Sequence, residues 1–278
     1  MVQQLLQSNY PLLQETLLKK IREATEAERI FILAAVLTKQ QLLTSFNKEH
    51  TSLLLVSGLL ILLVTGKESV SIHDMESHVE HCCGDLLPVT AIVIRTRQFD
   101  EWSAAGHPFI YTVQKKSIIA FEKDTIETCH PGQATEDKKE KEKLLLATIN
   151  RAEEFLAGAE LFQLRKQNAM AAFMLHQAAE QCLRVLLEIT TGYYCNTHSI
   201  ERLLRVNTFL YPCLSAIFAQ HSEKDKIQMQ LLQKAYIDTR YKEDYCIHRQ
   251  NLIVLTERVT RLKELLKQEG TIILHTMH

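Results

Sequence analysis

The chain has 278 residues, of which 46% are hydrophobic and 23% are charged, so it can form one large domain or two ordinary ones around a buried core. Its 32 Lys and Arg residues almost balance its 33 Asp and Glu residues, which leaves a formal net charge of -1. This balance excludes a chain-wide basic field that attracts nucleic acid, so a site for a polyanion must be a local patch. We interpret the length as two domains.

The cysteines and the N-terminal residues indicate the compartment. The seven cysteines are odd in number and lack the short paired spacings of a zinc site or of a secreted disulfide framework. The first twenty residues, MVQQLLQSNYPLLQETLLKK, lack the basic start, apolar centre and small-residue cleavage site of a signal peptide. We therefore expect a protein of the reducing cytoplasm, and we predict no metal ion and no cofactor.

The first predicted elements are a helix from Pro11 and two strands. An apolar run from Glu28 to Val36 predicts the first strand, and the run from Leu53 to Val64, broken only by Ser57 and Gly58, predicts the second. The second run is too short for a membrane helix, which needs about 20 apolar residues. A near-continuous apolar run is typical of a strand covered on both faces, with Gly58 as a break or bulge. A buried helix is the alternative.

A strand, helix, strand unit follows. Ser71 and Asp74 have the spacing of a capping box, and Gly84 supplies a stop, so SIHDMESHVEHCCG predicts a helix. The run from Leu87 to Thr96 is rich in β-branched residues and predicts the next strand.

Two more elements complete the first half. The segment RQFDEWSAAGHP predicts a short helix that ends at Gly106 and Pro108, and SIIAFEKD predicts one more strand. Residues 1–124 therefore indicate a small α/β domain. Residues 125–138 interrupt the apolar pattern with a Pro-Gly pair and charged residues, which is typical of a domain linker.

The order of these elements resembles the minimal nucleotidyltransferase fold, in the form that is fused to a second, helical domain in bacteria. Working members of that family carry a Gly-Ser pair after the first strand, an Asp-x-Asp pair on the second and an acidic residue on the third. The corresponding places here hold Ala34 and Ala35, the sequence LLILLV at residues 59–64, and Thr90.

These replacements remove the chemistry that the resemblance implies. Two metal ions about 4 Å apart need several anionic oxygens, which leucine, isoleucine and alanine do not supply. The resemblance therefore implies a bacterial protein whose first domain keeps the fold and has lost the transfer reaction. Two alternatives stay open: an unrelated small α/β domain, and a transferase that uses Asp74, Glu76 or Asp85.

From Lys139 onward the sequence has the 3.6-residue period of helices. Two apolar stripes carry this period: Ala172, Leu175, Ala179, Leu183 and Leu186, and then Leu252, Leu255, Val259, Leu262 and Leu265. Gly192 is expected to end the first of these helices, and Thr197 or Ser199 to cap the next. Residues 139–270 are therefore predicted to be an all-α helical bundle, which makes the whole chain an α+β protein of two domains.

Two segments of this half resemble a HEPN domain. The string FMLHQAAEQCLRVLLEITTGYYCNTHSIERLL is similar to its centre, where an AAE-type helix precedes a Thr-His pair and a Leu-rich helix. The string YIDTRYKEDYCIH resembles the segment before its last helix. The resemblance implies a homodimer and one of two activities. Some HEPN proteins are metal-independent ribonucleases that use an Arg, four to six residues and a His, and others bind a nucleotide or RNA without cutting it.

The pair that best fits this motif is Arg240 and His248, but seven residues separate them. On one straight helix they would lie about 80° apart around the axis and about 12 Å apart along it, which is a poor shared face. The surrounding residues form the densest group of phosphate-seeking and base-stacking side chains in the sequence: Tyr236, Arg240, Tyr241, Lys242, Tyr245 and His248. The structural alternative is that the tyrosines are half-buried and that Arg240 pairs with Asp238 or Glu243.

These observations favour a non-catalytic regulatory protein that binds a nucleotide or RNA and assembles as a homodimer. The expected ligand-binding residues are Tyr236, Arg240, Tyr241, Lys242 and His248. The alternative function is a metal-independent RNA endonuclease of the toxin class, in which His248 transfers protons and Arg240 stabilises the phosphate charge. No membrane and no sequence-specific reading of DNA are expected.

Three other groups have a structural interpretation and a functional one. His176 and Glu180, at i and i+4 of one helix, could bind a metal or transfer protons, but buried polar partners are the better interpretation. His198 is expected to cap or pack the start of a helix. Five residues crowd one short helix: His73, His78, His81, Cys82 and Cys83. His78 and His81 could hold zinc, but no spacing supplies the remaining ligands, so an exposed helix surface is the preferred interpretation.

Overall fold

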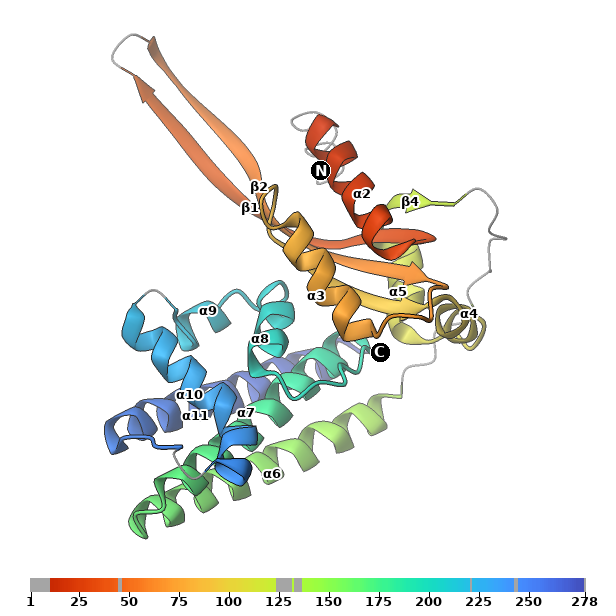
Figure 1. The fold of residues 1–278 in the computed structure, drawn as a ribbon. Helices are drawn as coiled ribbons and strands as arrows, with labels where there is room; N and C mark the ends of the chain where they lie inside the picture. Colours follow the sequence, from red (N-terminus) through yellow and green to blue (C-terminus); the bar gives the residue numbers. More distant parts are fainter. Residues whose placement is uncertain are drawn as a thin grey trace. The chain divides into compact units, whose positions relative to one another are not determined.

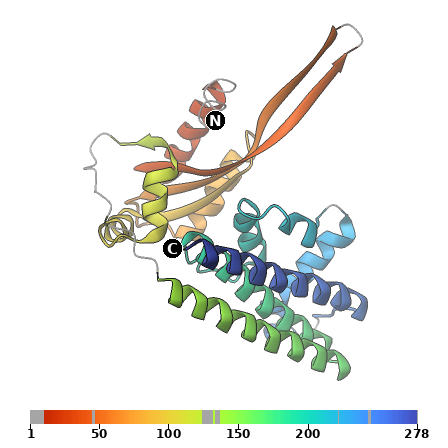
Figure 2. The same cartoon turned by 180° about the vertical axis from the view of Figure 1, so that it is seen from behind.

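The computed structural model divides into two compact units, Met1–Thr135 and Glu136–His278, which are shown in Figures 1 and 2. The structure describes residues 11–44, 47–123, 132, 137–220, 222–242 and 245–277. The first unit contains a four-stranded sheet with helices, and the second is helical, so the α+β class is confirmed. In these ranges, no helix is both long enough and apolar enough to cross a membrane. Most of residues 125–138 lie outside the described ranges, so the linker boundaries stay a prediction.

The first unit follows the predicted order of elements with one addition. Its elements are α2 (Pro11–Thr25), β1 (Arg29–Thr44), β2 (Asn47–Thr65), α3 (Ile72–Cys83), β3 (Val89–Arg95), α4 (Thr96–Ala104), α5 (Pro108–Lys116) and β4 (Ile118–Glu122). The addition is α5, because Pro108 does more than end the preceding helix: it stands in the first turn of a new one, where its missing N–H costs nothing. Ser71 caps α3 as predicted, and its side chain accepts a hydrogen bond from the Asp74 N–H.

The sheet has the order β3-β2-β1-β4. The strands β1 and β2 are antiparallel, β2 and β3 are parallel, and β1 and β4 are antiparallel. The pairing with β3 covers only Leu59–Thr65 of β2, and the pairing with β4 covers only Arg29–Ile32 of β1. Beyond these residues β1 and β2 continue as the two-stranded ribbon that projects from the sheet in Figures 1 and 2.

The apolar run that resembles an active-site strand is the central strand of this sheet. Residues 59–64 of β2 are all at most 4% exposed. Leu59, Ile61 and Leu63 belong to a core cluster that includes residues of α2 and α3. Figures 1 and 2 show α4 and α5 on the opposite face of the sheet. Helices on both faces explain why the run is apolar without alternation.

The predicted irregularity in β2 lies one residue from Gly58. The pairing shifts between Val36 opposite Gly58 and Leu37 opposite Val56, so Ser57 is the extra residue of a β-bulge. The Ser57 hydroxyl accepts a hydrogen bond from the Thr38 hydroxyl at 2.8 Å and donates one to the Val36 carbonyl at 3.3 Å. The bulge lies where β1 and β2 leave the sheet.

Two carboxylates of α3 cover the free edge of β3. The Val93 N–H donates a hydrogen bond to Glu76 Oε1 at 3.3 Å, and the Ala91 N–H donates one to Glu80 Oε1 at 3.2 Å. An edge strand presents a row of backbone groups that must find partners when they are buried. Because Glu76 is 2% exposed and binds this backbone, its carboxylate has a structural function.

The second unit is a bundle built on three long helices. Its elements are α6 (Lys138–Leu164), α7 (Asn168–Thr191), α8 (Ile200–Thr208), α9 (Leu214–Ile217), α10 (Glu223–Tyr241) and α11 (Arg249–Thr276). Helix α7 ends as predicted at Gly192, which has a left-handed φ of 78° that favours glycine. Ser199 rather than Thr197 caps α8, because its side chain accepts a hydrogen bond from the Arg202 N–H.

Candidate functional site

Arg240 and His248 lie on different helices. Arg240 is in the last turn of α10, which ends at Tyr241, and His248 is the residue that precedes the first turn of α11. The single-helix geometry considered for this pair therefore does not occur. His248 is exposed and its side chain does not cap α11. The relative position of the two side chains therefore depends on the break between α10 and α11, and not on the geometry of one helix.

The Arg240 guanidinium is exposed and surrounded by aromatic rings. Its Cζ lies 4.2 Å from the ring centroid of Tyr236, 5.4 Å from that of Tyr241 and 5.9 Å from that of Phe173 on α7. Its Nε donates a hydrogen bond to the Tyr236 carbonyl at 2.8 Å. Within the described ranges no carboxylate pairs with Arg240. The arginine is thus oriented by cation–π contacts and one hydrogen bond while its charge stays available.

Lys242, a predicted ligand-binding residue, and Tyr245, a neighbour in the same cluster, both have structural partners. Lys242 Nζ lies 3.0 Å from Asp238 Oδ1, so Asp238 is the partner of Lys242 and not of Arg240. The Tyr245 hydroxyl donates a hydrogen bond to the Leu231 carbonyl at 2.9 Å, and burial raises its pKa. Tyr241, in contrast, is 75% exposed and offers a ring face to a ligand.

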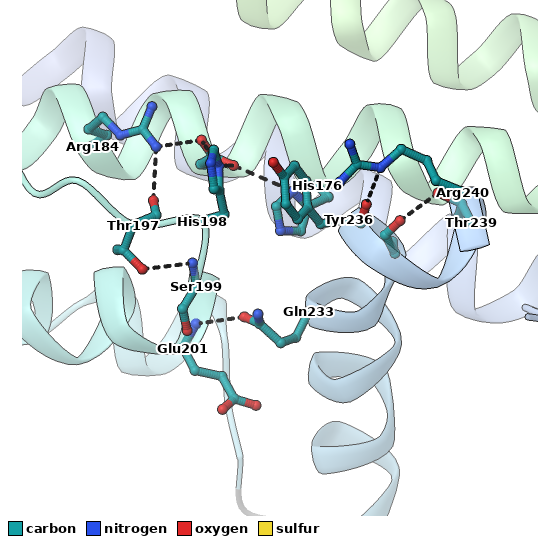
Figure 3. A network of polar contacts seen from close by, with 12 residues as sticks. His176, Arg184, Thr197, His198, Ser199, Glu201, Gln233, Tyr236, Thr239 and Arg240 are labelled. Carbon is teal, nitrogen blue, oxygen red and sulfur yellow. Dashed lines mark hydrogen bonds and ion pairs between the residues drawn. The ribbon is translucent and has the colours of Figure 1, made fainter. Parts of the chain in front are cut away.

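Tyr236 stands at the centre of a column of side chains (Figure 3). The His198 ring stacks on it with a centroid distance of 4.4 Å and an interplanar angle of 16°. The buried ring of His176 lies 5.2 Å away at 25°. Figure 3 shows Tyr236 between His198 and Arg240. Because its ring is occupied in this way, Tyr236 supports other site residues and does not offer a free face for a base.

A buried carboxylate orients His198. The side chain of Glu180 is 2% exposed, and both of its oxygens lie 3.1 Å from His198 Nδ1. Arg184 Nη2 donates hydrogen bonds to Glu180 Oε1 at 2.5 Å and to the Thr197 carbonyl at 2.8 Å. A carboxylate held in this way fixes the tautomer and the direction of a histidine ring. His198 therefore does not cap α8 but joins α7 to the loop before α8.

Residues 145–269 match the family model of the HEPN domain. The helical unit is a HEPN domain. The matched range contains every residue of the Tyr236 column, and the first unit lies outside it. No curated protein matches the chain.

In the HEPN domain the structure adds His198, Glu180 and Arg184 to the side chains predicted around Arg240. The sequence contained two signals for them: the Thr-His pair at residues 197–198, and the i, i+4 spacing of His176, Glu180 and Arg184 along α7. What the sequence did not contain is the contact between them, because His198 and Glu180 are 18 residues apart and meet only when the loop before α8 folds back on α7.

Among the described parts of the chain, no group of three or more His, Cys, Asp or Glu side chains is arranged so that it could hold a metal ion. In α3 the His78 ring and the Cys82 thiol are 3.6 Å apart without a third ligand. The adjacent Cys83 is buried, and burial raises the pKa of its thiol to about 11. The arrangement is that of a helix surface with one buried thiol.

His176 makes the stability of the HEPN domain depend on pH. Its side chain is fully buried, its Nδ1 lies 3.8 Å from Glu180 Oε2, and burial lowers its pKa to about 4. The unfolded chain takes up a proton as the pH falls below about 6.5, but the folded chain does not until about pH 4, so stability is lost between these values. From pH 7 to pH 5 the loss is about 2 kcal/mol.

Urea unfolding at pH 7 and pH 5 measures this loss. The His176→Phe variant keeps an aromatic ring beside Tyr236 but does not titrate, so its stability is expected to fall less than that of the original protein by about 2 kcal/mol. His275→Phe, a change at an exposed histidine of α11, is the control and is expected to behave like the original protein. Equal losses in the original protein and His176→Phe would contradict the assignment.

Proposed function

We propose that the HEPN domain binds a phosphate-bearing ligand, a nucleotide or RNA, on the surface around Arg240, and that it does so without cutting. The support comes from the Arg240 guanidinium, which is exposed, oriented by Tyr236, and without a carboxylate partner in the described ranges. An arginine fork grips a phosphate through two parallel hydrogen bonds. A phosphate binds best to a positive charge that is already oriented and that no carboxylate neutralises, and the Arg240 guanidinium is such a group.

The residues next to Arg240 suit the rest of a nucleotide. The exposed ring of Tyr241 gives a base a stacking surface, which is worth about 1–3 kcal/mol per base. Lys242 follows Tyr241 directly and His248 precedes α11, and both can supply positive charge or hydrogen-bond donors to the ligand. Lys242 contributes less than Arg240, because Asp238 already neutralises its ammonium group.

Cutting RNA with Arg240 and His248 needs more than binding does. A general base must lie within about 3 Å of the ribose 2'-hydroxyl, directly or through one water. His248 precedes α11 and does not share the helix of Arg240, and in the described ranges its exposed imidazole has no carboxylate to fix its tautomer. The geometry therefore favours binding over the endonuclease alternative for this pair.

Replacing Arg240 is expected to weaken ligand binding. Arg240→Ala should reduce the affinity for a fluorescein-labelled single-stranded RNA by about tenfold or more, because a charge-assisted hydrogen bond contributes about 1.5–3 kcal/mol. The loss of one phosphate contact should also reduce the dependence of affinity on salt. Fluorescence anisotropy at two salt concentrations measures both effects. Arg261→Ala, at an exposed position of α11, is the matched control and should leave both unchanged.

The same preparation tests the endonuclease alternative. With a chelator present, the intact protein is expected to leave the RNA uncut. Cleavage that is lost in Arg240→Ala and in His248→Ala alike would make the ribonuclease interpretation correct for this pair.

For the first unit we propose a nucleotidyltransferase-like fold that no longer transfers nucleotides. The support is chemical: residues 59–64 of the central strand carry no carboxylate, and Thr90 on β3 is 3% exposed. Of the acidic residues that could replace the missing ones, Asp74 accepts a hydrogen bond from Ser71 at the start of α3, and Glu76 binds the β3 backbone.

No nucleotidyl transfer is expected from the 278-residue protein. Incubation with labelled nucleoside triphosphates and Mg²⁺ or Mn²⁺ should leave no labelled product, because two metal ions lack the anionic oxygens that hold them. Incorporation of label that disappears in Asp74→Asn or Asp85→Asn would show that the active-site strands had been assigned wrongly.

We also propose that the protein forms a homodimer through one end of the HEPN domain. Large apolar side chains are exposed at the end of α6, near the end of α10 and at the start of α11: Leu161, Leu164, Ile237 and Ile253, at 54%, 80%, 54% and 55%. The Asn168 side chain at the start of α7 donates a hydrogen bond to the Ile247 carbonyl before α11, which places these helix ends together. An exposed apolar patch of this kind is typical of an interface.

The dimer is expected to depend on this patch. Light scattering at tens of micromolar should give twice the mass of one chain, and Leu164→Asp should give a single chain because a buried, unpaired carboxylate is costly in an interface. Leu146→Asp, which changes an equally apolar and 54% exposed residue near the other end of α6, should remain dimeric. A monomer for the unchanged protein would refute the proposal.

A further inference from the structure

His198 and Arg240 contact the same tyrosine ring. The His198 ring centroid is 4.4 Å from the Tyr236 centroid, and the Arg240 Cζ is 4.2 Å from it. The His198 ring centroid and the Arg240 Cζ are therefore separated by no more than the sum of these two distances. Figure 3 shows the two side chains on either side of Tyr236. Because the Tyr236 ring lies between them, one phosphate group cannot contact both His198 and Arg240. Two phosphate groups that flank one ribose can do so, with one phosphate at each side chain.

The contacts of His198 decide which of its atoms a ligand can reach. Its Nδ1 faces the buried Glu180 carboxylate, and one face of its ring covers Tyr236. The side chain is nevertheless 54% exposed, which leaves part of the ring away from Glu180 and Tyr236 open to a ligand. With Nδ1–H directed at the carboxylate, Nε2 of the neutral ring is an acceptor and repels a phosphate oxygen. Protonation turns Nε2 into a charged donor that attracts one.

The charged and titratable groups around His198 come from two helices. On α7, the Glu180 carboxylate faces His198 and the Arg184 guanidinium lies against that carboxylate, while His176 is uncharged because burial lowers its pKa to about 4. On α10, the Tyr236 ring stacks on His198, and the Arg240 guanidinium contacts the same Tyr236 ring. Glu180 is the nearest of these groups, and both of its oxygens contact His198 Nδ1. A phosphate bound at Nε2 would therefore place the protonated ring between two anions.

We infer that His198 is a second phosphate-binding residue of this site, and that the site takes a ligand with a phosphate on each side of one ribose, with His198 in its protonated form. This inference rests on the proposed function and names its ligand class. An RNA backbone has this arrangement of phosphates at every nucleotide, whereas a nucleoside monophosphate has only one. A protonated imidazole donates a hydrogen bond to phosphate through Nε2–H, so the second contact is lost when the ring loses this proton.

Isothermal titration with two probes tests the inference. The probes are adenosine 3',5'-bisphosphate and adenosine 5'-monophosphate, measured at pH 6.0 and pH 8.0 with the 278-residue protein and with His198→Gln. At pH 6.0 the original protein is expected to bind the bisphosphate about tenfold more tightly than His198→Gln does, because a charge-assisted hydrogen bond is lost. At pH 8.0 the two proteins should bind it alike.

The monophosphate and a control variant complete the design. The monophosphate is expected to bind both proteins alike at either pH, since its one phosphate is held by Arg240. The original protein and the variant are compared at the same pH, so the change in charge of the probe's own phosphates affects both measurements equally. His275→Gln, at an exposed histidine of α11, should behave like the original protein, and thermal unfolding should show that His198→Gln is folded.

The outcomes separate this inference from the proposed function. If Arg240→Ala weakens binding of both probes but His198→Gln binds the bisphosphate at pH 6.0 as tightly as the original protein, the inference is wrong and the proposed function stands. If the original protein binds neither probe and no single-stranded RNA, both are wrong. A tenfold difference confined to the bisphosphate at pH 6.0 establishes His198 as the second contact.

Discussion

The buried carboxylate of Glu180 is the group on which the geometry of the HEPN domain's site depends. A charge with a 2% exposed side chain must be neutralised, and Arg184 and His198 do this from two different segments of the chain. Because Arg184 also holds the Thr197 carbonyl, the loop before α8 is fixed against α7. The position of the His198 ring follows from this, and with it the position of Tyr236 and of Arg240 beyond it.

This arrangement explains why the site is built as a column. Each member restrains the next: Glu180 orients His198, His198 stacks on Tyr236, and Tyr236 holds Arg240 by its ring and its carbonyl. Side chains that are restrained before a ligand arrives lose less conformational entropy on binding. The fully buried His176 packs beside the column. Its neutral state keeps a further positive charge away from Arg240 and His198.

In the first unit buried polar groups also need hydrogen-bonding partners, but there the acidic side chains bind the backbone of a strand. Residues 59–64 of the central strand β2 are apolar and buried, and helices cover both faces of the sheet. The acidic side chains Glu76 and Glu80 are used to complete the hydrogen bonding of the β3 edge. The acidic groups of this unit hold the fold together, whereas in the HEPN domain they orient a site.

The sequence predicts elements whose side chains are buried in a regular pattern and misses those held by other means. The apolar runs gave all four strands, and the helical stripes gave α7 and α11. The predicted first strand ended at Val36, whereas β1 continues to Thr44, because the ribbon is held by backbone pairing with β2 and not by burial in the sheet. Helix α5 was missed because Pro108 can end one helix or begin another.

The residue types close together in the sequence located the cluster around Arg240, but they did not predict how its side chains are arranged. Tyrosine, arginine and histidine close together in the sequence indicated the location, and the break between α10 and α11 then separated His248 from Arg240. For His198 the sequence predicts only a capping or packing role, because a single histidine after a threonine has no periodic signal. Its contact with Glu180 depends on the path of the loop before α8, which no local pattern encodes.

A crystal structure of the 278-residue protein with adenosine 3',5'-bisphosphate at pH 6.0 would show whether both phosphates bind at the Tyr236 column. We expect one phosphate within hydrogen-bonding distance of the Arg240 guanidinium and the other within that distance of His198 Nε2, with Glu180 still on Nδ1. A ligand bound away from the Tyr236 column, or a His198 ring turned so that Nδ1 leaves Glu180, would contradict it.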